Sequence, residues 1–163
     1  MNILAWLTFI GLMIKAGAIL ISYTVSIGNP NGAKNLYMGL NLYNLRQYNF
    51  LHYTNAVSFM VAIIALEAFT AYLVIIVLSK IKLSNPFTAE VSRLLERISY
   101  IIFVTWLVSL FYEIHTKWLM GKVAGLQENP SSVEALFLAG VVFIFSQIFK
   151  KGVELQSEHE LTV

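Results

Sequence analysis

The sequence predicts an all-α integral membrane protein, a single domain in which four transmembrane helices form a bundle. Two observations indicate this fold, and the first is composition. The 163-residue chain is 58% hydrophobic, only 12% charged and contains no Asp, whereas soluble domains are about 45–50% apolar and about 25% charged. A chain with so few charges and a mean hydropathy of +0.70 cannot cover the surface of a soluble domain.

The second observation is that the apolar residues gather in four long runs. A helix needs about 20 apolar residues to cross a hydrocarbon core of about 30 Å. We therefore expect membrane spans at residues 3–27, 53–78, 98–120 and 133–149, followed by a tail at residues 150–163.

Turn and capping residues separate the four runs. Pro30 and Pro86 each follow an asparagine, a pair typical of turns. Thr88 is a suitable N-cap for the third helix, and Ser131 with Glu134 fits a capping box at the start of the fourth. Ahead of the third run, apolar residues recur at helical spacing, which predicts that this helix extends beyond the membrane: Val91, Leu94, Leu95 and Ile98.

Lysine and arginine residues predict the orientation, because cytoplasmic loops carry an excess of them. The side with the second loop and the tail has six: Lys80, Lys82, Arg93, Arg97, Lys150 and Lys151. The side with the other two loops has four: Lys34, Arg46, Lys117 and Lys122. We therefore expect both termini in the cytoplasm and the first and third loops on the outer side.

Two charged residues, Lys15 and Glu67, lie near the middle of the first and second predicted spans. Charges at that depth are costly, so they face a protein partner or a cavity. Antiparallel neighbours would place both near the midplane, and we expect an intramembrane ion pair that fixes the helix register. The alternative is a functional role, as a relay, as a ligand counter-ion or in the lining of a transport path. A water-filled cavity would favour that role, and a dry, packed pair would favour the structural one.

A second polar group, at the outer ends of the helices, consists of His52, Glu113, His115 and Glu134. Histidine and carboxylate side chains can bind a divalent metal. However, Glu113 and His115 are two residues apart and point to different helix faces, whereas Glu113 and Lys117 are four apart and can pair. We therefore expect interfacial polar residues here and no metal site.

Hydroxyl side chains within the spans have little water to bond to. We expect them to bond to backbone carbonyls or to neighbouring helices: Ser58, Thr70, Thr105, Ser109 and Ser146.

A cytoplasmic partner surface is predicted where the inner extension of the third helix meets the tail. The extension offers Arg93 and Arg97, and the tail offers Leu155, Leu161 and Val163 among polar residues. Apolar residues in a polar segment suit docking, either on the bundle or on a partner. The alternative is a frayed, solvated chain end.

Several function classes have no support in the sequence. Without cysteine there is neither thiol catalysis nor a Cys-ligated metal. No nucleophile constellation, phosphate loop or dinucleotide motif occurs, so we expect neither an enzyme nor a cofactor. A net charge of +2 is too small to indicate nucleic-acid binding. We expect a non-enzymatic regulatory or sensing component that contacts membrane lipids and acts with a cytoplasmic partner. The alternative is a small transporter or a lipid- or small-ligand-binding membrane protein.

Two stretches carry a family resemblance: Asn-Pro-Phe-Thr-Ala-Glu-Val at residues 85–91, and Lys-Lys-Gly-Val-Glu-Leu at residues 150–155 with the ending Glu-Leu-Thr-Val. Over roughly residues 80–163 the chain resembles a family of small four-helix bacterial membrane proteins of unknown function. The resemblance implies the bacterial inner membrane and gives no catalytic residues. Members are often encoded beside small helix-turn-helix regulators of the Cro/C1 type, which implies such a regulator as the partner.

Overall fold

The computed structural model describes residues 3–81, 87–126 and 133–160, and this part of the chain is helical without strands. Its elements are α1 (Ile3–Gly28), the short 3-10 helix η1 (Pro30–Lys34), α2 (Tyr43–Tyr48), α3 (Phe50–Lys80), α4 (Ala89–Met120) and α5 (Val133–Glu160). The four long helices are apolar enough to cross a membrane. These findings confirm the predicted all-α class and the expectation of four helices long and apolar enough to span a membrane.

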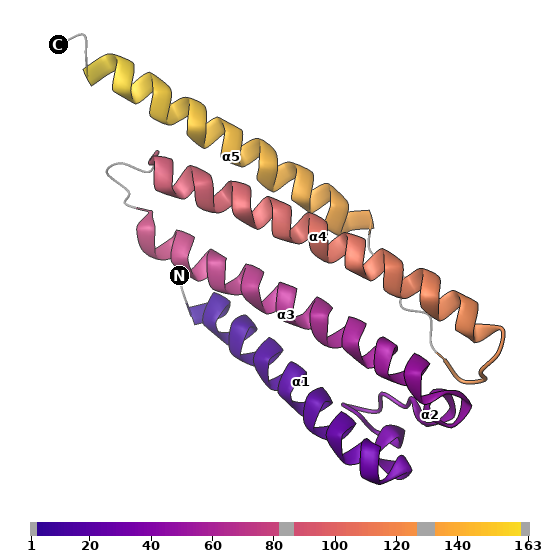
Figure 1. Ribbon diagram of the computed structural model, residues 1–163. Coiled ribbons are helices and arrows are strands. Elements are labelled where there is room, and N and C mark those ends of the chain that lie inside the picture. Colours follow the sequence, from indigo (N-terminus) through magenta and orange to yellow (C-terminus); the bar gives the residue numbers. More distant parts are fainter. Residues whose placement is uncertain (1–2, 82–86, 127–132, 161–163) are drawn as a thin grey trace.

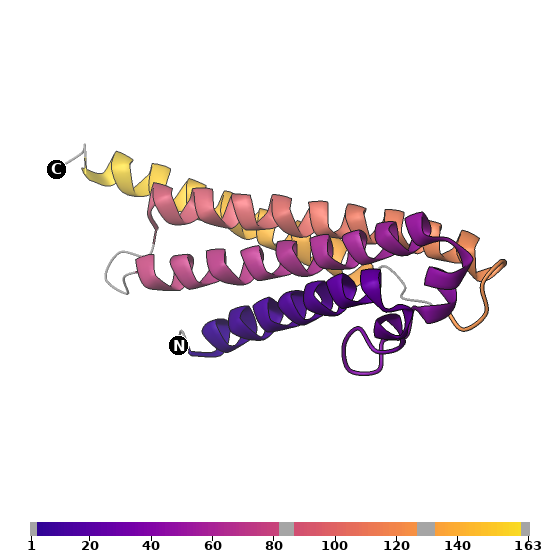
Figure 2. The ribbon, with the colours of Figure 1, turned by 60° about the horizontal axis from the view of Figure 1, so that its bottom comes forward.

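The four long helices lie side by side in chain order, each running opposite to the one before (Figure 1). Helix α1 packs on α3, α3 on α4 and α4 on α5. Among the described residues, α1 contacts neither α4 nor α5, and α3 does not contact α5. After a turn of the view, α5 lies partly behind α3 and α4 (Figure 2), so the row is curved. The bundle is therefore open along one side.

The helices begin where capping residues predict. The Thr88 side chain accepts a hydrogen bond from the Val91 amide at 3.2 Å, which confirms the predicted N-cap of α4. Asn49 caps α3 in the same way through the amides of Leu51 and His52. Pro86 and Ser131 lie outside the described residues, so the predicted break and capping box at these positions stay predictions.

Two helices are longer than the membrane spans that we expect from hydropathy. Helix α4 begins at Ala89, which confirms the predicted extension ahead of the third span. Helix α5 continues to Glu160, so the first eleven residues of the tail are helical rather than frayed. Both extensions lie at the end of the bundle that holds the termini, which we call the terminal end.

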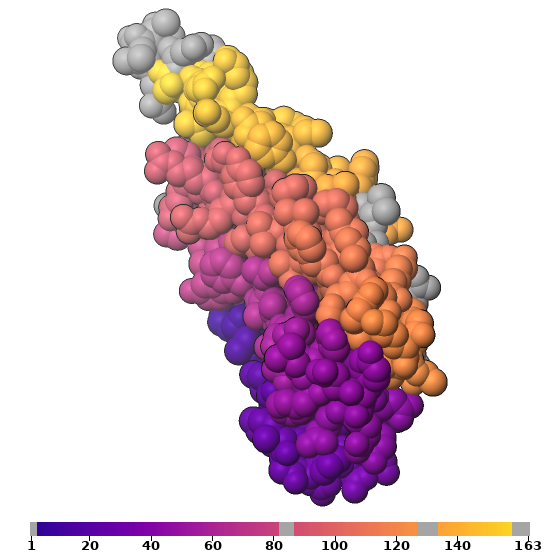
Figure 3. Space-filling view, turned by 45° about the vertical axis from the view of Figure 1, so that its right-hand side comes forward, coloured from indigo at the N-terminus to yellow at the C-terminus, as the bar shows by residue number. Residues whose placement is uncertain are grey.

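The opposite end is closed by residues 29–49, which we call the cap. Its helices η1 and α2 pack against α1 and α3, and Figure 3 shows the cap in violet at one end of the elongated molecule. The buried core is concentrated at this end, where Leu36, Leu42 and Leu45 of the cap share one cluster with Tyr53 of α3 and Leu119 of α4. A smaller apolar cluster near the terminal end joins α3 to α4 through Leu73, Val77, Val91 and Ile98.

Polar contacts tie the cap to the helices. Next to the cap, the hydroxyls of Ser26 and Tyr53 lie 2.7 Å apart and link α1 to α3, the two long helices on which the cap packs. The Arg46 guanidinium donates to the Ile27 carbonyl at 3.1 Å, and the Asn44 amide donates to the Ala124 carbonyl at 3.0 Å. These contacts fix the cap over the open row, where it forms part of the wall of the site described below.

Candidate functional site

Lys15 of α1 and Glu67 of α3 line the same pocket, which has a volume of about 340 Å³. Lys15 is half-buried and Glu67 is exposed to the space beside it. Apolar and aromatic side chains complete the wall, two of them from the cap: Ile19, Tyr37, Leu40, Met60, Ile63, Ile64 and Tyr112. We call this space the charged pocket.

The two residues carry opposite charges and line the charged pocket from different helices. In the described part of the chain, salt bridges with N···O distances of 4.0 Å or less join Lys80 to Glu90, Lys117 to Glu113 and Lys151 to Glu154. Lys15 and Glu67 are not joined in this way. A direct ion pair between Lys15 and Glu67 stays a prediction. The pocket that both residues line could not be inferred from the sequence.

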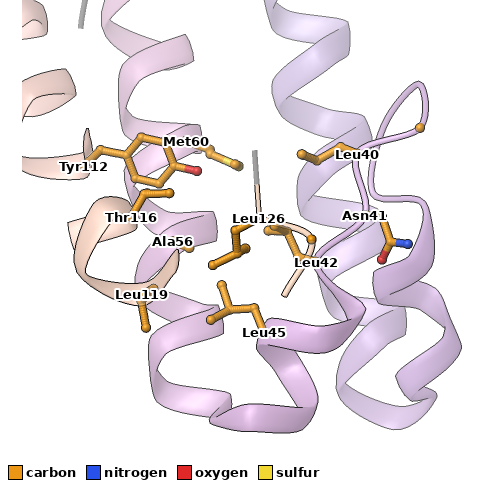
Figure 4. A pocket seen from close by; sticks show the side chains of 12 residues that line it. Leu40, Asn41, Leu42, Leu45, Ala56, Met60, Tyr112, Thr116, Leu119 and Leu126 are labelled. Atoms are coloured by element: carbon orange, nitrogen blue, oxygen red, sulfur yellow. The ribbon is translucent and has the colours of Figure 1, made fainter. Parts of the chain in front are cut away.

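Two further spaces adjoin the charged pocket. Toward the cap, a pocket of about 200 Å³ shares Leu40, Met60 and Tyr112 with it, and we call this the cap pocket. Met60 of α3 and Tyr112 of α4 both extend into it (Figure 4). On the other side, a groove of about 460 Å³ shares Glu67. Glu67 thus lies where the charged pocket meets this groove.

All four long helices contribute to the groove, which we call the four-helix groove. Its lining residues are Thr8, Leu12, Glu67, Thr70, Ala71, Ile102, Thr105, Ala135 and Leu138. Thr70 and Thr105 donate to backbone carbonyls four residues earlier, which confirms the expectation for these two hydroxyls. The groove exists because the row is curved and α1 does not close against α5.

The predicted outer polar group is divided in the structure. His52 and His115 come together, with ring centroids 5.4 Å apart, and Trp118 packs against both. Glu113 bonds Lys117 at 2.6 Å, which confirms the predicted pair at a spacing of four residues. Glu134 lies in the first turn of α5. Within the described ranges, no set of three or more His, Cys, Asp or Glu side chains could hold a metal ion.

The predicted partner surface at the terminal end is partly described. Arg93, Lys150 and Glu154 line a hollow of about 400 Å³ between α4 and α5. Arg97 and Leu155 are exposed, whereas Leu161 and Val163 lie outside the described residues.

A hydrogen bond and an aromatic contact are part of the packing of α5 against α4 and the residues just before it at this end. The Ser92 hydroxyl donates to the Ser146 carbonyl at 3.0 Å. The rings of Phe87 and Phe149 lie 5.1 Å apart. A Cβ atom at Gly152 would lie 2.7 Å from the Phe87 ring, so only glycine fits there without a shift. Phe87 of the Pro-Phe-Thr stretch therefore lies against Gly152 of the Lys-Lys-Gly stretch.

Four apolar helices and an intramembrane pocket with two charges define a multi-pass membrane protein. The chain belongs to the family described as Protein of unknown function (DUF2975), which matches residues 39–163. No curated protein and no solved structure matches the chain. The family match begins well before residue 80, where we expect the resemblance to begin, and it includes Glu67. It leaves out α1 and with it Lys15.

Proposed function

We propose that this protein binds a small molecule within the membrane, at Lys15 and Glu67. The observation that supports this proposal is that the two charges line an open pocket instead of closing on each other. Ligand pockets are typically about 300–1,000 Å³, mostly apolar, with a few convergent polar groups, and the charged pocket fits that description at about 340 Å³. A purely structural ion pair would have no need of such a space.

The proposed role is binding, as a receptor or a transporter, rather than catalysis. The charged pocket offers one ammonium, one carboxylate and the phenols of Tyr37 and Tyr112, and its other side chains are apolar. Acyl or phosphoryl transfer needs a nucleophile with an adjacent base, or a metal, together with donors for the developing charge. This set instead suits recognition of a polar group carried into the membrane on an apolar body.

The accessibility of Glu67 tests this proposal. Dicyclohexylcarbodiimide is an apolar reagent that partitions into bilayers and modifies carboxyl groups there. We expect mass spectrometry of the protein in phosphatidylcholine vesicles to show modification at Glu67, because this side chain is exposed to the four-helix groove. Glu67→Gln should remove the adduct, and Glu113→Gln, which changes a carboxylate paired with Lys117, should not. A Glu67 that stays unmodified under saturating reagent would contradict an accessible site.

A second candidate function is regulation, because the terminal end presents a formed surface. Helices α4 and α5 stay paired there through Ser92–Ser146 and Phe87–Phe149 contacts, and α5 remains helical to Glu160. We propose that this surface faces the cytoplasm of a bacterium, in line with the Lys/Arg asymmetry, and docks a small helix-turn-helix regulator of the Cro/C1 type. Ligand binding at Glu67 and docking at the terminal end would together make a membrane sensor.

Deleting residues 156–163 should abolish capture of the cytoplasmic partner and leave the bundle folded. The α4–α5 contacts at Ser92, Phe87 and Gly152 all lie outside the deleted segment. A reporter enzyme fused after Val163, active only in the cytoplasm, first establishes that the tail faces that compartment. Pull-downs then compare the full chain, the deletion and a chain whose residues 156–163 are replaced by Gly and Ser. If all three recover the same partner, or if the reporter is inactive, this surface is wrong.

A further inference from the structure

The four-helix groove combines one charge with an otherwise apolar wall. Glu67 is the charged residue among its described lining residues, and Leu12, Ile102 and Leu138 are among the apolar ones. Glu67 lies close to the middle of α3 (Phe50–Lys80), and therefore deep in the bilayer. A ligand there must enter from the hydrocarbon and carry an apolar body.

The polar atoms of the groove are all acceptors. A hydroxyl has one hydrogen to donate. Each threonine of the groove donates this hydrogen to the backbone carbonyl four residues earlier. Thr8 donates to Leu4 at 3.0 Å, Thr70 to Leu66 at 3.0 Å and Thr105 to Ile101 at 2.8 Å. Their oxygen lone pairs, with the Glu67 carboxylate, remain available to a ligand. The groove therefore favours a hydrogen-bond donor and offers nothing to an anion.

The Glu67 carboxylate also needs a positive charge. An ionised carboxylate in hydrocarbon is costly unless a counter-charge or hydrogen-bond donors accompany it. Among the described residues, no hydrogen bond and no salt bridge of 4.0 Å or less provides the Glu67 carboxylate with a donor or a counter-charge. Lys15 lies across the charged pocket from this carboxylate. A cation in the four-helix groove would approach Glu67 through a space that Lys15 does not line.

We propose that the four-helix groove binds a lipophilic amine, a protonated amine on a compact apolar body, with its N–H groups directed at Glu67 and the neighbouring threonine oxygens. The groove volume of about 460 Å³ suits a molecule of that size. The inference rests on the proposed ligand-binding function and gives it a substrate class. It keeps Glu67 as the binding residue and places the ligand in the groove that adjoins the charged pocket. It also makes Lys15 a competitor of the ligand, because both cations are attracted to one carboxylate.

The test uses 1-aminoadamantane and its neutral counterpart 1-adamantanol, which share one apolar cage. Equilibrium dialysis with radiolabelled probe, against the full chain in phosphatidylcholine nanodiscs and with empty nanodiscs as the blank, measures saturable binding. We expect saturable binding of the amine and none of the alcohol. Glu67→Gln should weaken amine binding at least tenfold, and Lys15→Met should strengthen it. Glu113→Gln, which changes a carboxylate outside the groove, should leave it unchanged.

Three results would overturn the proposal. They are no saturable binding of the amine, equal binding of both probes, or an amine affinity that neither Glu67→Gln nor Lys15→Met changes. Lys15→Met keeps the test decisive if Glu67→Gln does not fold. Replacing half of the phosphatidylcholine by phosphatidylethanolamine should not change amine binding. If the added lipid competed with the amine, the groove would be assigned to a lipid ammonium group instead of a free amine. If the carbodiimide modifies Glu67 but the amine does not bind, the site stands and the substrate class is wrong. If both fail, the ligand-binding function fails as well.

Discussion

Replacing Tyr53 by alanine is expected to lower the free energy of unfolding by about 3–5 kcal/mol, the usual cost of removing a large buried aromatic side chain. Tyr53 is 0% exposed and lies in the core beneath the cap. Its ring packs on Tyr23 and Phe50, with centroids 5.6 and 6.1 Å away, and its hydroxyl bonds Ser26 of α1. The substitution therefore removes both the apolar packing and one of the polar links between α1 and α3.

Unfolding in mixed micelles of increasing denaturing detergent, followed by circular dichroism, measures this effect. Tyr53→Phe should cost about 1 kcal/mol, because it removes one hydrogen bond and keeps the ring. Tyr100→Ala is the matched control, since Tyr100 is 56% exposed on the surface of α4. If Tyr53→Ala were no more destabilising than Tyr100→Ala, the core beneath the cap would not hold the bundle together.

The long helices could be predicted from the sequence because their signals are local. Few charges, four apolar runs and a threonine N-cap at Thr88 are enough to place α1, α3, α4 and α5. Hydropathy misses the true helix ends, because backbone hydrogen bonding continues after the apolar run stops. The polar extensions from Ala89 and through Glu160 show this, although helical spacing at Val91 and Leu94 did predict the first of them.

The cap could not be predicted in the same way, because its closure depends on distant contacts. The Leu42 amide donates to the Ala33 carbonyl at 2.8 Å, and Asn44 reaches the Ala124 carbonyl on the loop after α4. Helix α2 has only six residues, too few to show a helical period. Such a segment is ordered by what it packs against, which no local pattern reveals.

The sequence indicates Lys15 and Glu67 as candidate residues, but it does not indicate the shape of the pocket that they line. Lys15 and Glu67 are conspicuous because charge is rare inside a membrane span. The charged pocket between them depends on how α1 is set against α3 and on Tyr37 and Leu40 of the cap. Thr8 could not be predicted as part of the site, because one threonine near the start of an apolar run gives no signal in the sequence. Its role depends on α1, α3, α4 and α5 facing a common groove.

The outer polar group shows the same limit. Which of its members meet depends on the rotation of α3 against α4, and this rotation brings together His52 and His115. Only the pair on a single helix, Glu113 and Lys117, follows from spacing alone.

Lys15 and Glu67 face one pocket as separated, opposite charges, and a double-mutant cycle measures the coupling between them. Unfolding free energies are measured for Lys15→Met, Glu67→Gln and the double variant. Each single replacement leaves the other charge stranded in the membrane, and the double replacement removes both. Because two unit charges 4 Å apart attract by about 4 kcal/mol at an effective dielectric constant of about 20, a wider separation predicts a coupling energy of about 1–3 kcal/mol. Strictly additive effects, with a coupling energy near zero, would contradict a shared pocket.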